Sequence, residues 1–167
     1  MVFTGDGKGK TTSALGLALR SAGHGLKVCF IQFIKGSWTY GELAAVKRHR
    51  DTIDFHVMGR GFTWASADLE MDKEAARQAW EFARKIIAAG THHLVVLDEF
   101  TYLLNYHMID LEPVLKTLTG RPDNQHVAIT GREAPGALLD IADLVTEMKA
   151  VKHPFQDGTK AQKGIEF

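Results

Sequence analysis

Short apolar runs alternate with amphipathic stretches along the whole chain. Residues 28–31 and 94–97 are apolar at every position, which is typical of strands that are covered on both faces. The alternation of such runs with helical patterns predicts βαβ units and a parallel sheet. The runs expected to form strands are residues 1–4, 28–33, 55–58, 93–97, 126–130 and 144–148.

Helical periodicity fills the intervals between these runs. The longest such stretch, residues 72–89, carries apolar side chains every three or four positions and is followed by Gly90, a residue type that often ends helices. The expected helices are residues 11–22, 72–89, 112–118 and 135–142. We therefore expect one α/β domain over residues 1–167, with a mostly parallel sheet of about six strands and helices on both faces, of the P-loop NTPase or RecA-like kind.

Stretches without periodicity follow the strands or end the chain, at residues 34–41, 59–70 and 150–167. In an open α/β sheet, ligands bind outside the carboxyl ends of the strands. Functional residues are therefore expected in these loops.

Composition narrows the function classes. Twenty basic side chains balance twenty acidic ones, which argues against a nucleic-acid-binding surface. Cys29 is the single cysteine, so no disulfide can form within the chain. Neither a signal peptide nor a membrane span is apparent, and we expect a cytoplasmic protein without a membrane partner.

The sequence TGDGKGKTT, residues 4–12, has the character of a phosphate-binding loop. The usual pattern places four residues between its first glycine and Gly-Lys-Ser/Thr, whereas three separate Gly5 from Gly9 here. Glycines let backbone N–H groups turn inward, Lys10 can reach phosphate oxygens, and Thr11 can ligate Mg²⁺. The alternative is an ordinary glycine-rich turn. Because only residues 1–3 precede the loop, we expect that upstream residues were removed or never present.

Two carboxylates, Asp98 and Glu99, follow the apolar run at 94–97. Acidic residues at a strand end opposite a phosphate loop are typical of a Mg²⁺-binding element. Successive side chains of a strand point to opposite faces, so the two carboxylates are not expected to face a metal in the same way. Taken alone, such a pair would more often cap a turn.

Three further loop residues have two interpretations each. Lys35, after the second strand, either meets phosphate or is a solvated lysine. Phe62 and Trp64, flanked by glycine, either belong to the core or form the wall of a pocket for a flat ligand.

The histidine and tyrosine residues give weaker indications of function. The eight histidines lack metal-ligand spacing, which favours surface and strand-end positions. Tyr102, Tyr106 and His107 follow the carboxylate pair and either line a site or pack a short helix.

Together these stretches resemble the P-loop corrinoid adenosyltransferases, the cob(I)alamin or cob(I)yrinic acid a,c-diamide adenosyltransferase family. The resemblance covers nearly the whole chain, and the family's loop is short by the same residue. This sequence departs from the family's loop at Asp6, where the family has Asn. Many family members also carry an N-terminal extension, before the first strand, that helps to cover the site. The matching stretches, in order, are TGDGKGKTT, AGHG at 22–25, QFIKGSW at 32–38, GFTW at 61–64, VVLDEFTY at 95–102 and VKHPFQDGTKAQKGIEF at the end.

The resemblance implies transfer of the 5′-deoxyadenosyl group of ATP to the Co(I) of cobalamin or a precursor corrinoid, with release of triphosphate. It also implies that ATP lies reversed along the loop, so that the ribose 5′-carbon faces the acceptor. A homodimer and an electron-donating flavoprotein reductase are further implications. The ATP-binding residues implied are Gly5, Asp6, Gly7, Lys8, Gly9, Lys10, Thr11 and Thr12.

The resemblance also assigns roles to individual residues. Lys10 neutralises the triphosphate, and Thr11 with Glu99 ligates Mg²⁺ or Mn²⁺. Phe62 and Trp64 match the aromatic residues that line the lower face of the corrin. Lys10, Phe62 and Trp64 are thus the residues expected to act in catalysis.

Other classes of P-loop protein fit less well. A small-molecule kinase, the main alternative, normally uses an arginine-bearing lid, and Arg60, Arg121 and Arg132 are scattered along the chain. A GTPase-like switch needs a guanine-reading Asn-Lys-x-Asp stretch, which the sequence lacks. Neutral charge disfavours a DNA-dependent ATPase.

Overall fold

A computed structural model describes residues 1–34, 40–59, 61 and 69–166 of the chain. Its centre is a six-stranded sheet in the order β3-β2-β4-β5-β1-β6, and every pair of neighbouring strands is parallel. This arrangement confirms the predicted α/β class. The strands are β1 (Val2–Thr4), β2 (Val28–Gln32), β3 (Ile53–Val57), β4 (Leu94–Asp98), β5 (His126–Thr130) and β6 (Val145–Glu147).

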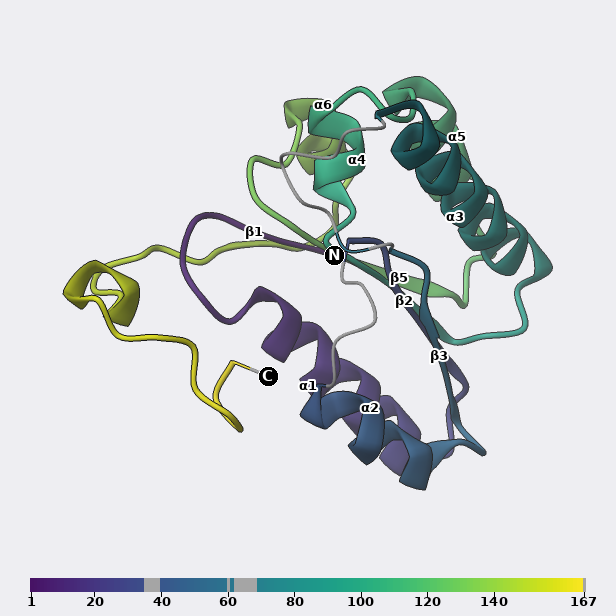
Figure 1. Ribbon diagram of the computed structural model, residues 1–167. Helices are drawn as coiled ribbons and strands as arrows, with labels where there is room; N and C mark the ends of the chain where they lie inside the picture. The colour runs from purple at the N-terminus through teal and green to yellow at the C-terminus, as the bar shows by residue number, and fades with distance from the viewer. Residues whose placement is uncertain (35–39, 60, 62–68, 167) are drawn as a thin grey trace.

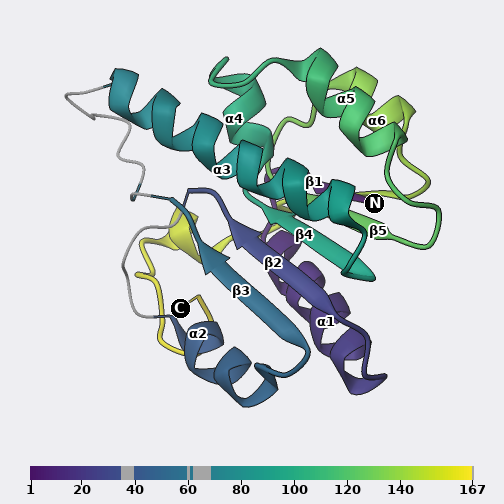
Figure 2. The same ribbon diagram turned by 90° about the vertical axis from the view of Figure 1, so that its right-hand side faces the viewer.

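Helices cover both faces of the sheet, with α1 and α2 on one side and α3 to α6 on the other (Figure 1, Figure 2). Side chains of β2 alternate between the two resulting cores: Cys29 and Ile31 join the core under α3, whereas Val28 and Phe30 join the core under α1. All residues of β2 and β4 are buried, as their unbroken apolar runs predict. The helices are α1 (Lys10–Gly23), α2 (Gly41–Val46), α3 (Leu69–Ala89), α4 (Thr101–Asn105), α5 (Leu111–Thr119) and α6 (Gly136–Asp140), with 3₁₀ turns η1 (Lys47–His49) and η2 (Pro154–Asp157).

Differences from the predicted elements are confined to short segments and ends. The helices α2 and α4, of six and five residues, were not predicted because they are too short for an apolar period to repeat. The strand β3 begins at Ile53 rather than at residue 55, and α3 begins at Leu69, inside a stretch that was expected to be irregular. The 3₁₀ turn η2 likewise interrupts the irregular C-terminal stretch.

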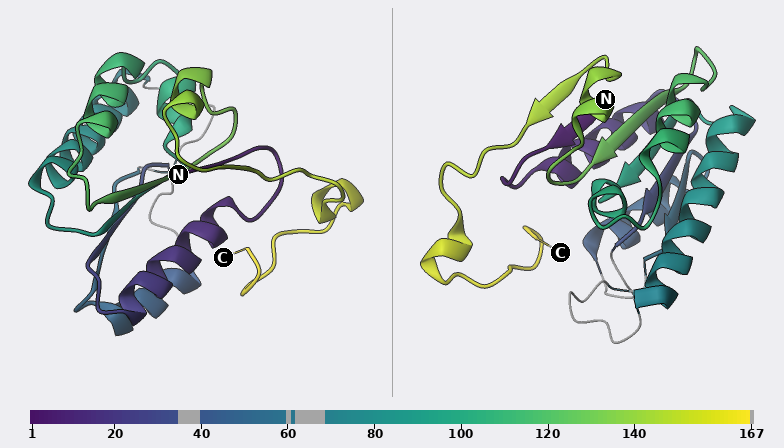
Figure 3. Two further views of the ribbon diagram at one scale, coloured as in Figure 1. Left: turned by 180° about the vertical axis from the view of Figure 1, so that it is seen from behind. Right: turned by 90° about the horizontal axis from the view of Figure 1, so that it is seen from above.

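The strand order places the loop after β1 and the carboxylates after β4 at the same edge of the sheet, separated by β5. In register, Gln32 lies beside Asp98, and Thr130 lies beside Phe3. The C-terminal segment leaves β6, extends away from the sheet and returns toward the start of α1 (Figure 3). Within the described part of the chain, no helix combines the length and apolarity that crossing a bilayer requires.

Candidate nucleotide-binding site

The glycine-rich loop, residues 5–12, connects β1 to α1 and packs closely against the chain that follows β6. Gly5 has a φ of 92°, and a Cβ there would lie 2.5 Å from the carbonyl oxygen of Met148. A Cβ at Gly7 would lie 2.7 Å from the carbonyl carbon of Lys149, and the Gly7 N–H donates to Met148 O at 2.6 Å. Glycine is therefore required at both positions by conformation or by close approach.

Lys10, the first residue of α1, points its ammonium group into the curve of this loop. Its Nζ donates to the carbonyl oxygens of Gly5 at 2.6 Å and Gly7 at 2.7 Å. Burial lowers the pKa of Lys10, and the nearby charge of Arg132 lowers it further, against the opposite effect of Glu99 and Asp6. The ammonium is thus held by neutral oxygens, which the charged oxygens of a phosphate chain can replace.

Asp98, at the end of β4, is a fully buried carboxylate that accepts hydrogen bonds from three residues of the described part of the chain. The hydroxyl groups of Thr11 and Thr130 both donate to its Oδ1, at 2.9 Å and 2.7 Å, and the amide of Gln32 donates to its Oδ2 at 3.3 Å. Since the Thr11 proton is directed at Asp98, the lone pairs of Thr11 Oγ1 remain available as a ligand for a cation.

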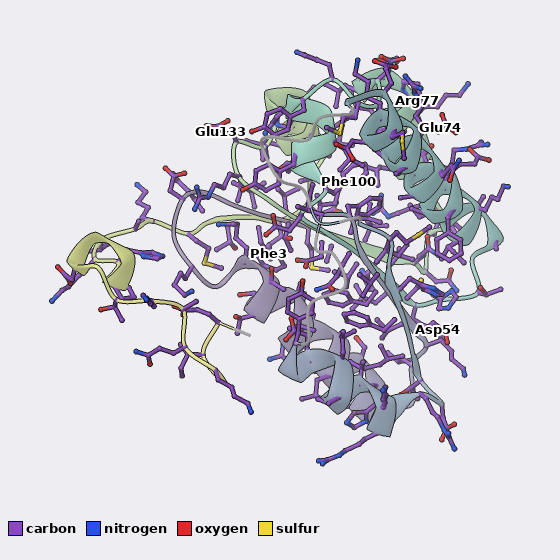
Figure 4. The ribbon with its side chains drawn as sticks, viewed as in Figure 1. Phe3, Asp54, Glu74, Arg77, Phe100 and Glu133 are labelled. Atoms are coloured by element: carbon purple, nitrogen blue, oxygen red, sulfur yellow. The ribbon has the colours of Figure 1, made fainter. Side chains whose placement is uncertain are left out.

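Glu99, the residue after β4, has a left-handed backbone conformation with a φ of 63°, so the chain turns away from the strand at this residue. Its N–H donates to Thr130 Oγ1 at 2.9 Å. The next residue, Phe100, is fully buried and packs against the rings of Phe33 and Trp80 at 5.1 Å and 5.2 Å (Figure 4). Asp98 and Glu99 therefore face different surroundings, the first the protein interior and the second a cavity.

This cavity has a volume of about 490 Å³ and is lined by residues 6–12 of the glycine-rich loop. Glu99, Tyr102 and Arg132 also line it, as do His153, Ile165 and Glu166 of the C-terminal segment. A second cavity of about 480 Å³ adjoins it, and both share Asp6, Lys8, Arg132, His153 and Glu166. The C-terminal segment therefore contributes directly to the site.

The structure brings most of the predicted ligand-binding residues together. Residues 6–12 and Glu99 line one cavity, and Gly5 supplies the carbonyl that holds Lys10. Tyr102 also lines it and stacks on Tyr106 at 6.3 Å. Burial raises the pKa of Tyr102, with a smaller contribution from Glu99. Lys35, Arg60, Phe62 and Trp64 lie outside the described residues.

Sequence reasoning singled out none of the residues that the C-terminal segment contributes, His153, Ile165 and Glu166, and it missed others nearer the loop. It gave no role to Gln32 or Thr130, and it treated Arg132 only as one of three scattered arginines. The signal present in the sequence was the stretch Thr130-Gly131-Arg132 directly after an apolar run. Arg121 lies elsewhere, where it pairs with Asp143 and donates to the carbonyl oxygens of Leu118 and Gln125.

A divalent cation fits these donors. Among the described residues, no group of three or more His, Cys, Asp and Glu side chains could hold a metal ion. Mg²⁺ does not need such a cage, because it is usually bound by one or two protein oxygens together with water and substrate phosphates. The oriented hydroxyl of Thr11 and the cavity-lining carboxylate of Glu99 supply oxygens of this kind.

Comparisons with known proteins identify the family of the chain. The model of the family described as ATP:corrinoid adenosyltransferase BtuR/CobO/CobP matches residues 1–167. A corrinoid adenosyltransferase of Escherichia coli strain K12 is 46% identical over 167 residues, which cover 100% of this chain and 84% of the relative. A corrinoid adenosyltransferase of Pseudomonas aeruginosa is also 46% identical, with 82% of the relative covered. Corrinoid adenosyltransferase CobA of Salmonella typhimurium is 45% identical, with 84% covered. The chain therefore belongs to the ATP:corrinoid adenosyltransferase family.

Proposed function

We propose that this protein transfers the 5′-deoxyadenosyl group of ATP to the Co(I) of cobalamin or a precursor corrinoid. Co(I) forms the bond to the ribose 5′-carbon, the carbon–oxygen bond breaks, and its electron pair leaves with triphosphate. The cobalt thereby gives up two electrons and becomes formally Co(III). The observation that supports this proposal best is the cavity in which the shortened glycine-rich loop faces Glu99 and Arg132.

The corrinoid substrate supplies the nucleophile, so the chain needs neither a nucleophilic side chain nor a general base. Its task is to hold the 5′-carbon in line with cobalt and to stabilise the charge of the leaving triphosphate. Lys10 and the loop residues 5–12 are the groups that would bind the triphosphate. Lys10 would then exchange its bonds to Gly5 and Gly7 for bonds to phosphate oxygens.

Thr11 and Glu99 are the residues that would hold Mg²⁺ or Mn²⁺, and Asp98 would orient Thr11 from behind. When bound, the ion would neutralise part of the triphosphate charge. The kinase alternative is disfavoured, since family membership is with adenosyltransferases and the fixed arginine of the cavity belongs to the end of β5 rather than to a lid.

Phe62 and Trp64, which lie outside the described residues, are proposed to cover the lower face of the corrin. Apolar rings in place of the lower axial ligand would leave cobalt four-coordinate and easier to reduce. Substitution of either residue by alanine should then impair adenosylation from cob(II)alamin and a flavoprotein reductant more than adenosylation from cob(I)alamin. Equal losses in both assays would leave only a role in shaping the pocket.

An electron-donating flavoprotein reductase and a homodimer, both implied by the family resemblance, complete the proposal. A cytoplasmic location is also proposed, because the sequence shows neither a signal peptide nor a membrane span. The reaction itself is tested by mixing the protein with ATP, Mg²⁺ and chemically reduced cobalamin. The expected result is the absorbance spectrum of an adenosylated corrinoid together with one triphosphate per product. Formation of ADP instead would indicate a kinase, and neither product would contradict the proposal.

A further inference from the structure

Arg132 follows the end of β5, and contacts with α4 hold its backbone in place. The preceding Gly131 has a φ of 146°, and a Cβ there would lie 2.0 Å from Thr101 Oγ1. The same Thr101 hydroxyl donates to the carbonyl oxygen of Arg132 at 2.6 Å, and Asn105 Nδ2 donates to it at 3.2 Å. Two residues of α4 thus set the position from which Arg132 reaches the cavity.

Three cationic side chains of the described residues, Lys8, Lys10 and Arg132, line this cavity, and the two lysines have partners. Lys8 forms an ion pair with Glu166 at 3.0 Å, and Lys10 donates to the two loop carbonyls. The guanidinium of Arg132 is exposed and makes no hydrogen bond or ion pair to any residue that the structure describes. Its charge nevertheless acts on Lys10, whose pKa it lowers.

An arginine and a lysine that line one cavity, and whose charges act on each other, form an arrangement that favours a polyanion. The cavity also contains the carboxylates of Asp6 and Glu99, yet neither forms an ion pair with Arg132. Since β1 and β5 are neighbouring parallel strands, Lys10 and Arg132 approach the cavity from adjacent loops at one sheet edge. A guanidinium presents its donors in a planar fork that matches two phosphate oxygens at once.

We propose that Arg132 binds the triphosphate chain of ATP and stabilises triphosphate as the leaving group. This inference rests on the proposed function, because it assigns a residue to the product that adenosyl transfer releases. As the bond to the 5′-carbon breaks, the electron pair moves onto the triphosphate oxygen and its negative charge grows. A cation at the triphosphate is therefore more strongly engaged in the transition state than in the ground state.

The direct test is binding of inorganic tripolyphosphate, measured by titration calorimetry without corrinoid. Arg132→Gln should weaken binding by about tenfold or more, as expected for the loss of a charge-assisted hydrogen bond, and Arg132→Lys should restore part of it. The matched control is Arg77→Gln, which removes the same charge from the outer face of α3 (Figure 4). Unchanged tripolyphosphate affinity in Arg132→Gln would overturn the assignment.

A second measurement separates this inference from the reaction. With ATP and chemically reduced cobalamin, Arg132→Gln should lower kcat as well as kcat/KM, whereas Arg77→Gln should match the unmodified protein. If the unmodified protein forms adenosylated corrinoid and Arg132→Gln keeps its full rate, the role in catalysis fails and the reaction stands. If no adenosylated corrinoid forms while tripolyphosphate binding depends on Arg132, the reaction fails and the triphosphate site stands.

Discussion

The hydroxyl group of Thr130 donates a hydrogen bond of 2.7 Å to Asp98 and accepts one of 2.9 Å from the backbone N–H of Glu99. One buried side chain of β5 therefore contacts both residues of the acidic pair, the carboxylate of Asp98 and the backbone of Glu99. It orients Asp98, which in turn receives the proton of Thr11, and it stabilises the left-handed backbone of Glu99. Thr130 is thus a positioning residue for the two oxygens that would ligate the metal.

Thr130→Val should weaken metal binding although Thr130 is not itself a ligand. Valine has nearly the same shape but cannot accept from Glu99 or donate to Asp98, so the variant should also lose about 1–3 kcal/mol of stability. Thr130→Ser, which keeps the hydroxyl, is the control. Binding of Mn²⁺ in the presence of ATP, followed by electron paramagnetic resonance, should be weaker for Val and near normal for Ser. Equal Mn²⁺ affinity in both variants would contradict the positioning role.

Glu99→Gln and Asp98→Asn should have different effects, because Glu99 is proposed to ligate the metal whereas Asp98 is proposed to orient Thr11. Glu99 is half-buried at the cavity, so its neutral isostere should raise the Mg²⁺ concentration needed for activity with little change in unfolding temperature. Asp98 is buried among three donors, and an amide there would direct its own N–H at one of them. Asp98→Asn should therefore also destabilise the fold. An unchanged Mg²⁺ titration in Glu99→Gln would move the ligand role to Asp98 or to neither residue.

The fold was predictable where apolar side chains recur with helical spacing over several turns, or where an unbroken apolar run forms a fully buried strand. Residues 94–97 indicate a central strand, and residues 72–89 indicate a long amphipathic helix. The helices α2 and α4 were not predictable, because a helix of one or two turns shows no recurring stripe. Their positions depend on packing rather than on pattern.

The candidate site was predictable where its residues are contiguous in sequence. The loop at residues 5–12 and the pair Asp98-Glu99 are each local, and their residue types point to phosphate and metal. Thr130 and Arg132 join them only because β5 lies between β4 and β1, an order that the sequence does not reveal. The contact between Lys8 and Glu166 joins opposite ends of the chain and was likewise not predictable.

If Lys10 binds the triphosphate as proposed, Lys10→Ala should reduce turnover at least tenfold at saturating ATP, because a charge-assisted hydrogen bond to the leaving group would be lost. Affinity for ATP should also depend on pH. Burial and the charge of Arg132 lower the pKa of Lys10, so the binding-competent ammonium loses its proton at a lower pH than an exposed lysine would. ATP affinity should therefore fall on the alkaline side, beginning below the usual pKa of lysine. Titration calorimetry across this range provides the measurement.

Two variants check that Lys10 is the group responsible for the alkaline decline. Lys10→Arg should remove the decline from the accessible range, because arginine keeps its charge. Arg132→Gln should move the decline to higher pH, because a repelling charge is removed from Lys10. A decline that stays in place in both variants would assign the titration to another group.

Glu166 occupies part of the site that phosphate would use. Its carboxylate is 3.0 Å from Lys8 Nζ, and hydrogen bonds from Lys8 and from the Gln162 N–H lower the pKa of Glu166. The carboxylate therefore stays ionised at neutral pH, where it competes with an incoming anion for Lys8. Glu166→Gln should remove this competitor and raise tripolyphosphate affinity, by up to about fivefold for a partly exposed ion pair.

The gain should shrink as salt is added, since exposed charges are screened. Glu81→Gln is the matched control, because it removes one acidic partner from an ion pair with Arg84 on α3, away from the cavity. Lys8→Gln removes the cation itself and should lower tripolyphosphate affinity whether or not Glu166 is present. If Glu166→Gln binds tripolyphosphate more weakly than the unmodified protein, competition is the wrong description. The ion pair would then act by holding the C-terminal segment where it lines the cavity, and releasing that segment would expose the bound anion to water.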